Sequence, residues 1–267
     1  GGRHRGETQG DAAQVRMMND YIQAIQNYLK DHGFEQLAPE AVLFDMDGVL
    51  FDSMRLHNES WQATAAAYDL EMLPDEPYTL EGCTSTLMIN TLMERTHQRQ
   101  ATAEELETIY TEKRRRFNAL PRPKRMPGAA EILEKVGRDG LQRVVVTGSG
   151  QRSLLERLQT AFPNVFRADL IVSCKDYTQG KPAPDPYLCG LERTSLRPNQ
   201  ALVVENAPLG VEAAVKAGIF TIAVNTGPLP DEALRERGAN LLFPSMQALA
   251  THWEEIRAAI AACAPTK

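Results

Sequence analysis

Five short apolar runs alternate with helical patterns along most of the chain, and this alternation constrains the fold more than any other feature. The runs are rich in Val, Ile and Leu without polar alternation, which is typical of strands buried on both faces. They cover residues 41–44, 143–146, 170–172, 201–204 and 220–224. Helical patterns lie at residues 128–136, 153–161, 185–192, 208–217 and 245–262. Strands that alternate with helices predict an α/β fold with a parallel sheet and right-handed crossovers.

The interval from residue 54 to residue 120 breaks this rhythm. It has no apolar run that predicts a buried strand, and its helical patterns cover residues 57–68, 86–95 and 103–117. We interpret it as a helical domain inserted after the first strand, with Asp52-Ser53 and Pro121-Arg122-Pro123 as hinges, since proline suits such boundaries. The chain then divides into an N-terminal extension (1–37), an α/β core domain (38–53 and 121–267) and a helical cap domain (54–120).

The N-terminal extension has the spacing of an amphipathic helix from Asp11 to about His32. Apolar side chains recur there every three or four residues, and Gly33 supplies a stop. Because coiled coils need about three to four heptads, we expect the helix to dock on the protein's own core, with a dimer contact as the alternative. The chain begins with Gly1-Gly2 and no Met, so we exclude the first ten residues from the fold and expect them to be disordered.

Charge and cysteine usage exclude several classes of partner. The net charge is −6 and the sequence pI is near 5.5, which argues against binding to nucleic acid or to an anionic membrane. No segment approaches the roughly 18 apolar residues that a membrane span needs. The four cysteines are widely spaced with no C-x-x-C pair, as expected for reduced thiols in the cytoplasm. We therefore expect a cytoplasmic monomer or weak dimer, for which a small anionic substrate remains possible.

Polar residues directly follow the apolar runs, where a parallel α/β sheet places its ligand site. They are Asp45 and Asp47, the segment 147–149 (Thr-Gly-Ser) and the segment 205–206 (Glu-Asn), and Lys181 lies in a loop after the third run. Carboxylates, an amide, a hydroxyl and a lysine together are the components of metal-assisted phosphoryl transfer, with Mg²⁺ as the metal that oxygen ligands favour. Taken singly, each has a structural alternative, such as a turn at the aspartates, a helix cap at the threonine or a solvated loop at the lysine.

Four segments in order resemble the motifs of the haloacid dehalogenase superfamily. They are LFDMDGVL at residues 43–50, VVVT at 144–147, GKPAPD at 180–185 and VEN at 204–206. Within the superfamily the chain is most similar to the β-phosphoglucomutase subgroup, and the resemblance runs from about Ala41 to Phe243. It implies a Rossmann-like core with an inserted helical cap, and it does not account for the N-terminal helix.

The resemblance also implies roles for the motif residues around Mg²⁺. Asp45 would be the nucleophile that forms an aspartyl-phosphate and a metal ligand. Asp47 would be the acid and base, with its backbone carbonyl on the metal. Thr147 would bind the phosphoryl group. Lys181 would screen the negative charge of Asp45 from that of the phosphate. The remaining implied roles are metal binding by Glu205 and Asn206, and substrate binding by Gly148, Ser149, Ser53 at the hinge and His57 in the cap.

Two departures from the family pattern affect the expected activity. The family usually has a carboxylate at Asn206, and with the amide the three remaining carboxylates, Lys181 and Mg²⁺ sum to a neutral site. We therefore expect weaker metal binding. In the cap, Glu81 and Ser85 stand where mutases carry a lysine and an arginine for the second phosphate. Their loss favours a phosphatase acting on a small phosphomonoester, with a sugar phosphate as the expected substrate.

Two alternatives to a phosphatase stay open. A mutase remains possible if other cap cations, such as Arg55 or Arg95, replace the missing pair. A phosphate-binding pseudoenzyme or receiver-type domain would also carry a phosphorylatable aspartate, but Asp47 favours turnover because a stable aspartyl-phosphate needs no acid or base.

Two further features of the cap have a structural interpretation. Trp61 is interpreted as cap packing, and the run 114–116 (Arg-Arg-Arg) as a solvated helix face unless it faces the cleft.

Overall fold

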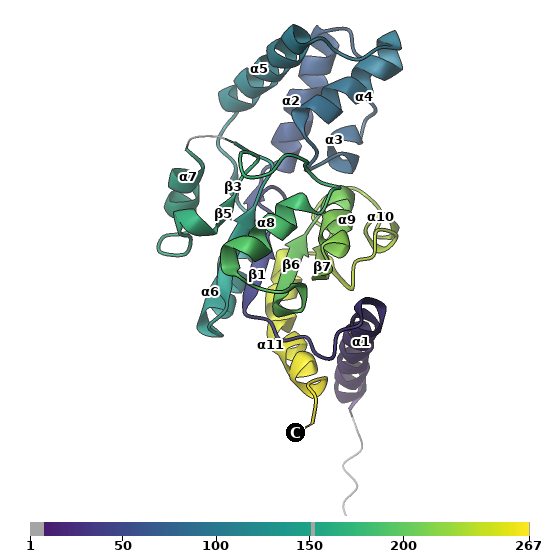
Figure 1. Ribbon diagram of the computed structural model, residues 1–267, viewed down its shortest axis with the longest axis vertical. Helices are drawn as coiled ribbons and strands as arrows, with labels where there is room; N and C mark the ends of the chain where they lie inside the picture. The colour runs from purple at the N-terminus through teal and green to yellow at the C-terminus, as the bar shows by residue number, and fades with distance from the viewer. Residues whose placement is uncertain (1–7, 151–152, 267) are drawn as a thin grey trace, which may run out of the picture.

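The computed structural model describes residues 8–150 and 153–266. Its centre is a six-stranded parallel sheet in the order β5-β4-β1-β6-β7-β8 (Figure 1). The strands are β1 (Ala41–Phe44), β4 (Gln142–Val146), β5 (Ile171–Val172), β6 (Ala201–Glu205), β7 (Phe220–Val224) and β8 (Leu241–Phe243). The predicted α/β class is therefore confirmed. The strand β8 was not predicted, because a run of three residues is too short to show a period.

Helices cover both faces of the sheet, as the unbroken apolar strands require. Alternate residues of a strand point to opposite faces, so Val42 packs on one side and Leu43 on the other. The first side is covered by α6 (Ala129–Arg138), α7 (Leu154–Ala161) and α11 (Met246–Ala262), and the second by α8 (Asp185–Thr194) and α9 (Pro208–Lys216). A short helix, α10 (Glu232–Arg235), and two 3₁₀ turns, η1 (Ala168–Leu170) and η2 (Pro198–Gln200), complete the core.

The cap is helical throughout and has an apolar cluster of its own. Its helices are α2 (Met54–Ala67), α3 (Glu76–Thr79), α4 (Ser85–His97) and α5 (Ala103–Ala119). The cluster includes Trp61, which is 8% exposed, so the packing interpretation is confirmed. Figure 1 shows the cap beyond one end of the sheet. Both connections pass through a short antiparallel ribbon of β2 (Phe51–Asp52) and β3 (Lys124–Arg125), where we propose the hinge.

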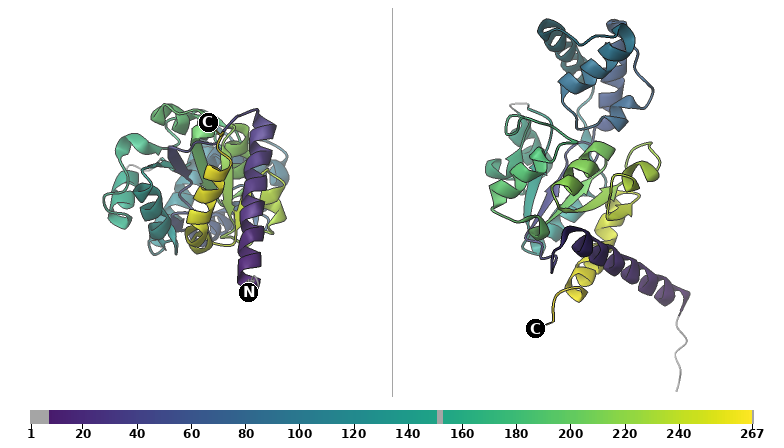
Figure 2. Two further views of the ribbon diagram at one scale, coloured as in Figure 1. Left: turned by 90° about the horizontal axis from the view of Figure 1, so that it is seen from below. Right: turned by 45° about the vertical axis from the view of Figure 1, so that its right-hand side comes forward.

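The N-terminal helix α1 (Gln9–His32) docks on the core beside α11 (Figure 2). Thr8 and Asp11 form a capping box at its start, and Gly33 ends it with a left-handed φ of 70°. Tyr28 is fully buried, and its hydroxyl donates to the carbonyl of Gly218 at 2.7 Å. The expected disorder of the first ten residues is wrong for residues 8–10, which cap and begin this helix. Residues 1–7 lie outside the described part.

The sequence predicted reduced cysteines and no membrane-spanning segment. All four cysteines are free thiols. Of the helices in the described ranges, none is both long and apolar enough to cross a lipid bilayer.

Candidate active site

Side chains from two strand ends and one loop meet at the cap-facing edge of the sheet. Asp45 follows β1, Glu205 ends β6, and Lys181 reaches in from the loop before α8. The Lys181 Nζ atom lies 3.0 Å from Asp45 Oδ1 and 2.7 Å from Glu205 Oε1, and it also donates to the carbonyl of Val146 at 3.3 Å. Residues far apart in the sequence therefore converge on one pocket, because parallel strands end at a common edge.

This carboxylate–lysine group is almost completely removed from water. Asp45 is 6% exposed, Lys181 2% and Glu205 0%. Burial and then the charge of Glu205 raise the pKa of Asp45 to about 8, although Lys181 acts in the opposite direction. Burial lowers the pKa of Lys181, but Asp45 and Glu205 outweigh it and hold that pKa well above its ordinary value. One buried ammonium therefore does not offset the burial and the mutual repulsion of the two carboxylates.

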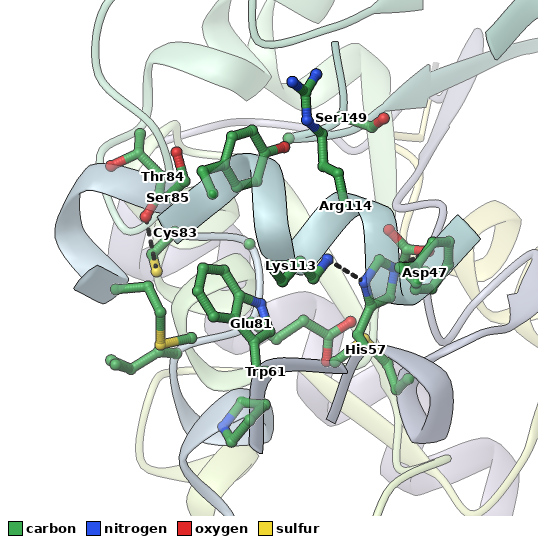
Figure 3. Close-up of a pocket in the computed structure, with 18 of the residues that line it drawn as sticks. Asp47, His57, Trp61, Glu81, Cys83, Thr84, Ser85, Lys113, Arg114 and Ser149 are labelled. Carbon is green, nitrogen blue, oxygen red and sulfur yellow. Dashed lines mark hydrogen bonds and ion pairs between the residues drawn. The ribbon is translucent and has the colours of Figure 1, made fainter. Parts of the chain in front are cut away.

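Asp47 has different partners from Asp45. It contacts one residue at the proposed hinge and one residue in the cap. Its Oδ1 atom accepts from the Ser53 hydroxyl at 2.5 Å and from His57 Nε2 at 3.1 Å. Burial alone would raise the pKa of Asp47, but His57 and Ser53 hold that pKa far below its ordinary value. The Lys113 ammonium donates to His57 Nδ1 at 2.8 Å (Figure 3), so His57 accepts at one nitrogen and donates to Asp47 from the other. Burial lowers the pKa of His57, which agrees with this neutral tautomer.

Lys113 is a site residue that the sequence analysis missed. It is 6% exposed and lies over the rings of Trp61 and Phe117, with its Nζ atom 5.4 and 5.0 Å from their centroids. His57 stacks on Phe117 at 4.2 Å. Burial lowers the pKa of Lys113 to about 8. Only the packing of α5 against α2 reveals this role, since a lysine in a polar helix has no distinguishing signal in the sequence.

Asn206 and Glu81 form a contact between core and cap that was also not expected. The Asn206 Nδ2 atom lies 3.1 Å from each Glu81 carboxylate oxygen, and both residues are buried. Burial, followed by the charge of Asp45, raises the pKa of Glu81 well above its ordinary value. The Asn206 Oδ1 atom is buried, and no hydrogen-bond partner for it is found in the described ranges. Such an unsatisfied oxygen beside two carboxylates fits a cation ligand.

The donor set therefore suits Mg²⁺, although it is not a preformed cage. No three His, Cys, Asp or Glu side chains of residues 8–150 and 153–266 converge in metal-binding geometry. Asp45, Asn206 and Glu81 offer oxygens at the site. Glu81 adds a carboxylate to the site where Asn206 lacks one, and burial disfavours the ionised form of that carboxylate. The expectation of weaker metal binding stays a prediction.

Glu205 has both carboxylate oxygens engaged by the protein. Its Oε1 atom accepts from Lys181 and, at 2.5 Å, from the Tyr187 hydroxyl, and its Oε2 atom accepts from the backbone N–H of Asn206 at 3.1 Å. Gly210 leaves room for the carboxylate, since a Cβ atom there would lie 2.0 Å from Oε1. This arrangement suits a residue that positions Lys181, and the metal-binding role of Glu205 stays a prediction.

A cavity of about 140 Å³ lies between the core and the cap. Asp45, Asp47, Gly148 and Ser149 line it from the core, and His57, Glu81, Lys113 and Arg114 line it from the cap. Thr147 is buried behind this wall, where its Oγ1 atom accepts from the N–H of Ser149 at 3.1 Å. All ten residues predicted for the site thus lie around one edge of the sheet.

The capped α/β fold and the positions of the four motifs agree with the haloacid dehalogenase class, and sequence comparison shows the same family. A family model for haloacid dehalogenase-like hydrolases matches residues 42–224, so the chain belongs to that family. The chain is 34% identical over 201 residues to a phosphorylated carbohydrates phosphatase of Thermotoga maritima, covering 75% of this chain and 92% of that protein. It is 25% identical over 225 residues to the β-phosphoglucomutase of Bacillus subtilis, covering 82% and 97%.

The solved structure of a putative β-phosphoglucomutase from Bacteroides vulgatus is similar over most of its length. It superposes with a TM-score of 0.88 at 49% identity, covering 91% of this chain and 98% of that one. The chain is therefore similar to both phosphatases and mutases of one family of enzymes that act on phosphate esters.

Proposed function

We propose that this chain is a Mg²⁺-dependent phosphatase that hydrolyses a small phosphomonoester through an aspartyl-phosphate on Asp45. The observation that carries the proposal is a pair of carboxylates, two residues apart, that line one cavity in different surroundings. Asp45 is bonded to Lys181, whereas Asp47 is bonded to the hinge and the cap. Hydrolysis through a covalent intermediate needs a nucleophile and a separate acid–base group, and the two aspartates suit these tasks.

The reaction balances with these two groups and water. A carboxylate oxygen of Asp45 attacks phosphorus, the bond from phosphorus to the ester oxygen breaks, and Asp47 gives its proton to the leaving alcohol. Asp47 then takes a proton from water as the water oxygen attacks phosphorus and the bond from phosphorus to the Asp45 oxygen breaks, which releases phosphate and restores the Asp45 carboxylate. The approach of an anionic phosphate raises the pKa of Asp47 and favours its protonation before the first step.

Neighbouring groups would offset charge on the transferring oxygens. Lys181, the Thr147 hydroxyl and the backbone after it are the proposed donors. Bound Mg²⁺ would supply Lewis-acid catalysis and neutralise charge. We propose Asp45, Asn206, Glu81 and the backbone carbonyl of Asp47 as the groups that hold it.

The expected substrate class is a small sugar phosphate. The cap closes over a cavity of about 140 Å³, which suits a small metabolite. The relatives include the phosphorylated carbohydrates phosphatase and a hexitol phosphatase A of Escherichia coli, which is 28% identical over 208 residues. These names motivate the choice of substrates to test.

A β-phosphoglucomutase is the second candidate, favoured by the similarity to the Bacteroides vulgatus structure. Two contacts weaken it. The guanidinium of Arg95, offered as a replacement cation, is bound by Glu76, and Glu81, which stands where mutases carry a cation, contacts Asn206 in the core. A mutase must hold a bisphosphate in two orientations, so the hydrolase is the better fit.

The test is a phosphate-release assay over sugar phosphates and nucleotides, with Mg²⁺ or with EDTA. We expect release that requires Mg²⁺ and that falls by several orders of magnitude in Asp45→Asn. Asp169→Asn is the matched control, because that carboxylate is 65% exposed and pairs with Arg167 on the surface. Conversion of glucose 1-phosphate to glucose 6-phosphate without phosphate release would identify a mutase instead.

A further inference from the structure

We propose that Arg114 binds a second anionic group on the substrate, so that the preferred substrate is a phosphomonoester that also carries a carboxylate or another phosphate. This inference rests on the proposed function, because it places the reacting phosphate at Asp45. It adds a specificity-determining residue on α5, at a position outside the family motifs.

The three consecutive arginines on α5 have different contacts. Arg115 and Arg116 both pair with Glu112, at 2.6 and 2.9 Å, and belong to the outer face of the helix. Arg114 lies instead along the cavity wall, with its guanidinium carbon 5.1 Å from the centroid of the Tyr110 ring. No carboxylate in the described ranges pairs with Arg114. Arg114 is also exposed to solvent, so the expected solvated face holds for all three arginines, and Arg114 in addition faces the cavity.

Two other cations near the reaction are already engaged, whereas Arg55 lines the adjoining cavity beside Glu81 and Asn206. The Lys181 ammonium binds Asp45 and Glu205, and the Lys113 ammonium binds His57. Among the described residues that line the cavity, Arg114 is the one cation for which no hydrogen bond is found. The carboxylates at the floor of the cavity repel anions, so a cation at a distance from them can fix which end of an anionic substrate enters first.

The placement of Arg114 suits the leaving-group side of the substrate. Figure 3 shows its side chain extending from α5 toward Ser149, across the cavity from Glu81. The reacting phosphate would lie at Asp45, which leaves the rest of the substrate against the cap wall. A guanidinium binds carboxylate or phosphate through two parallel hydrogen bonds, and stacking on Tyr110 orients it for this.

The experiment compares substrates that differ by one anionic group. Fructose 1-phosphate is paired with fructose 1,6-bisphosphate, and glycerol 3-phosphate with 3-phosphoglycerate, for the wild type, Arg114→Ala and the control Arg115→Ala. We expect Arg114→Ala to lower kcat/KM about tenfold or more for at least one doubly charged substrate and less than about threefold for its partner. The pair that responds identifies phosphate or carboxylate as the second group. Arg115→Ala should leave all four values within about threefold of wild type.

An equal loss on both members of each pair, or no loss, would overturn the inference while leaving the hydrolase intact. If the wild type releases phosphate from none of the four, the proposed function fails, and binding decides the inference separately. Calorimetric titration of fructose 1,6-bisphosphate into Asp45→Asn, with and without Arg114→Ala, should then show about tenfold weaker binding in the double variant. Equal binding would contradict the role of Arg114.

Discussion

At the scale of single residues, the chemistry depends on which partners each carboxylate has. The order of motifs predicts Asp45, Asp47, Lys181 and Asn206, because their positions follow from strand ends. The sequence does not predict that Glu81 would reach the core, since its role depends on how the cap packs. Glu81 stands where mutases carry a cation for the second phosphate. In this protein its carboxylate lies at the proposed metal site.

Lys113 makes a pH-dependent contribution to this residue network. Burial lowers the pKa of Lys113 to about 8, so the ammonium that donates to His57 is present below this pH and is lost as the pH rises through it. With Mg²⁺ bound, the cation favours the ionised form of Asp45. We then expect kcat/KM of the wild type to fall above pH 8, because Asp47 loses the support of a correctly oriented His57.

The pH–rate profile of Lys113→Met checks this expectation. The variant should have a lower kcat/KM at pH 7 and no decline centred near pH 8, whereas Lys216→Met, at a lysine that pairs with Glu212 on the surface, should behave as wild type. An unchanged alkaline limb in Lys113→Met would assign the titration to another group.

Glu81 is expected to have opposite effects on stability and on metal binding. The fold raises the pKa of Glu81, so its ionised form at pH 7 opposes folding when no cation is bound. Glu81→Gln should raise the free energy of unfolding in EDTA by about 1 kcal/mol or more, and weaken Mg²⁺ binding about tenfold or more. Urea unfolding and calorimetry measure the two quantities, with Glu94→Gln on the exposed side of α4 as the control. A loss of stability in EDTA would contradict the account of charge crowding.

At the scale of elements, long unbroken apolar runs were predictable and short elements were not. The strands β1 and β7 begin and end where the apolar runs do, because burial on both faces demands continuous apolar residues. The ribbon β2–β3 has two residues in each strand, so no period could indicate it. The helix α1 was predicted from its spacing, but its partner α11 was not, since a stripe does not specify the surface that it covers.

The docking of α1 gives a test of stability at this scale. Ile25 is fully buried between α1 and the core, whereas Val15 on the same helix is 54% exposed. Ile25→Ala should lower the free energy of unfolding by about 2–5 kcal/mol, because it leaves a cavity. Val15→Ala should change it by less than about 0.5 kcal/mol. Urea unfolding of both variants decides, and equal effects would mean that α1 does not dock in solution.

At the scale of the whole molecule, two contacts join the cap to the core at the site. One is the contact of Glu81 with Asn206, and the other links Lys113 through His57 to Asp47. The core alone would therefore lack both a proposed metal ligand and the groups that orient its acid–base residue. Because the motif residues lie in the core, they predict the chemistry, whereas we expect the cap to determine the substrate.

The most direct measurement is mass spectrometry of the peptide that contains Asp45, after rapid acid quenching during turnover of a sugar phosphate with Mg²⁺. We predict that a fraction of this peptide carries the added mass of one phosphoryl group, that fragmentation places it on Asp45, and that Asp45→Asn carries none. Phosphate release by an enzyme whose Asp45 peptide stays unmodified at every quench time, or modification at another residue, would contradict the proposed mechanism.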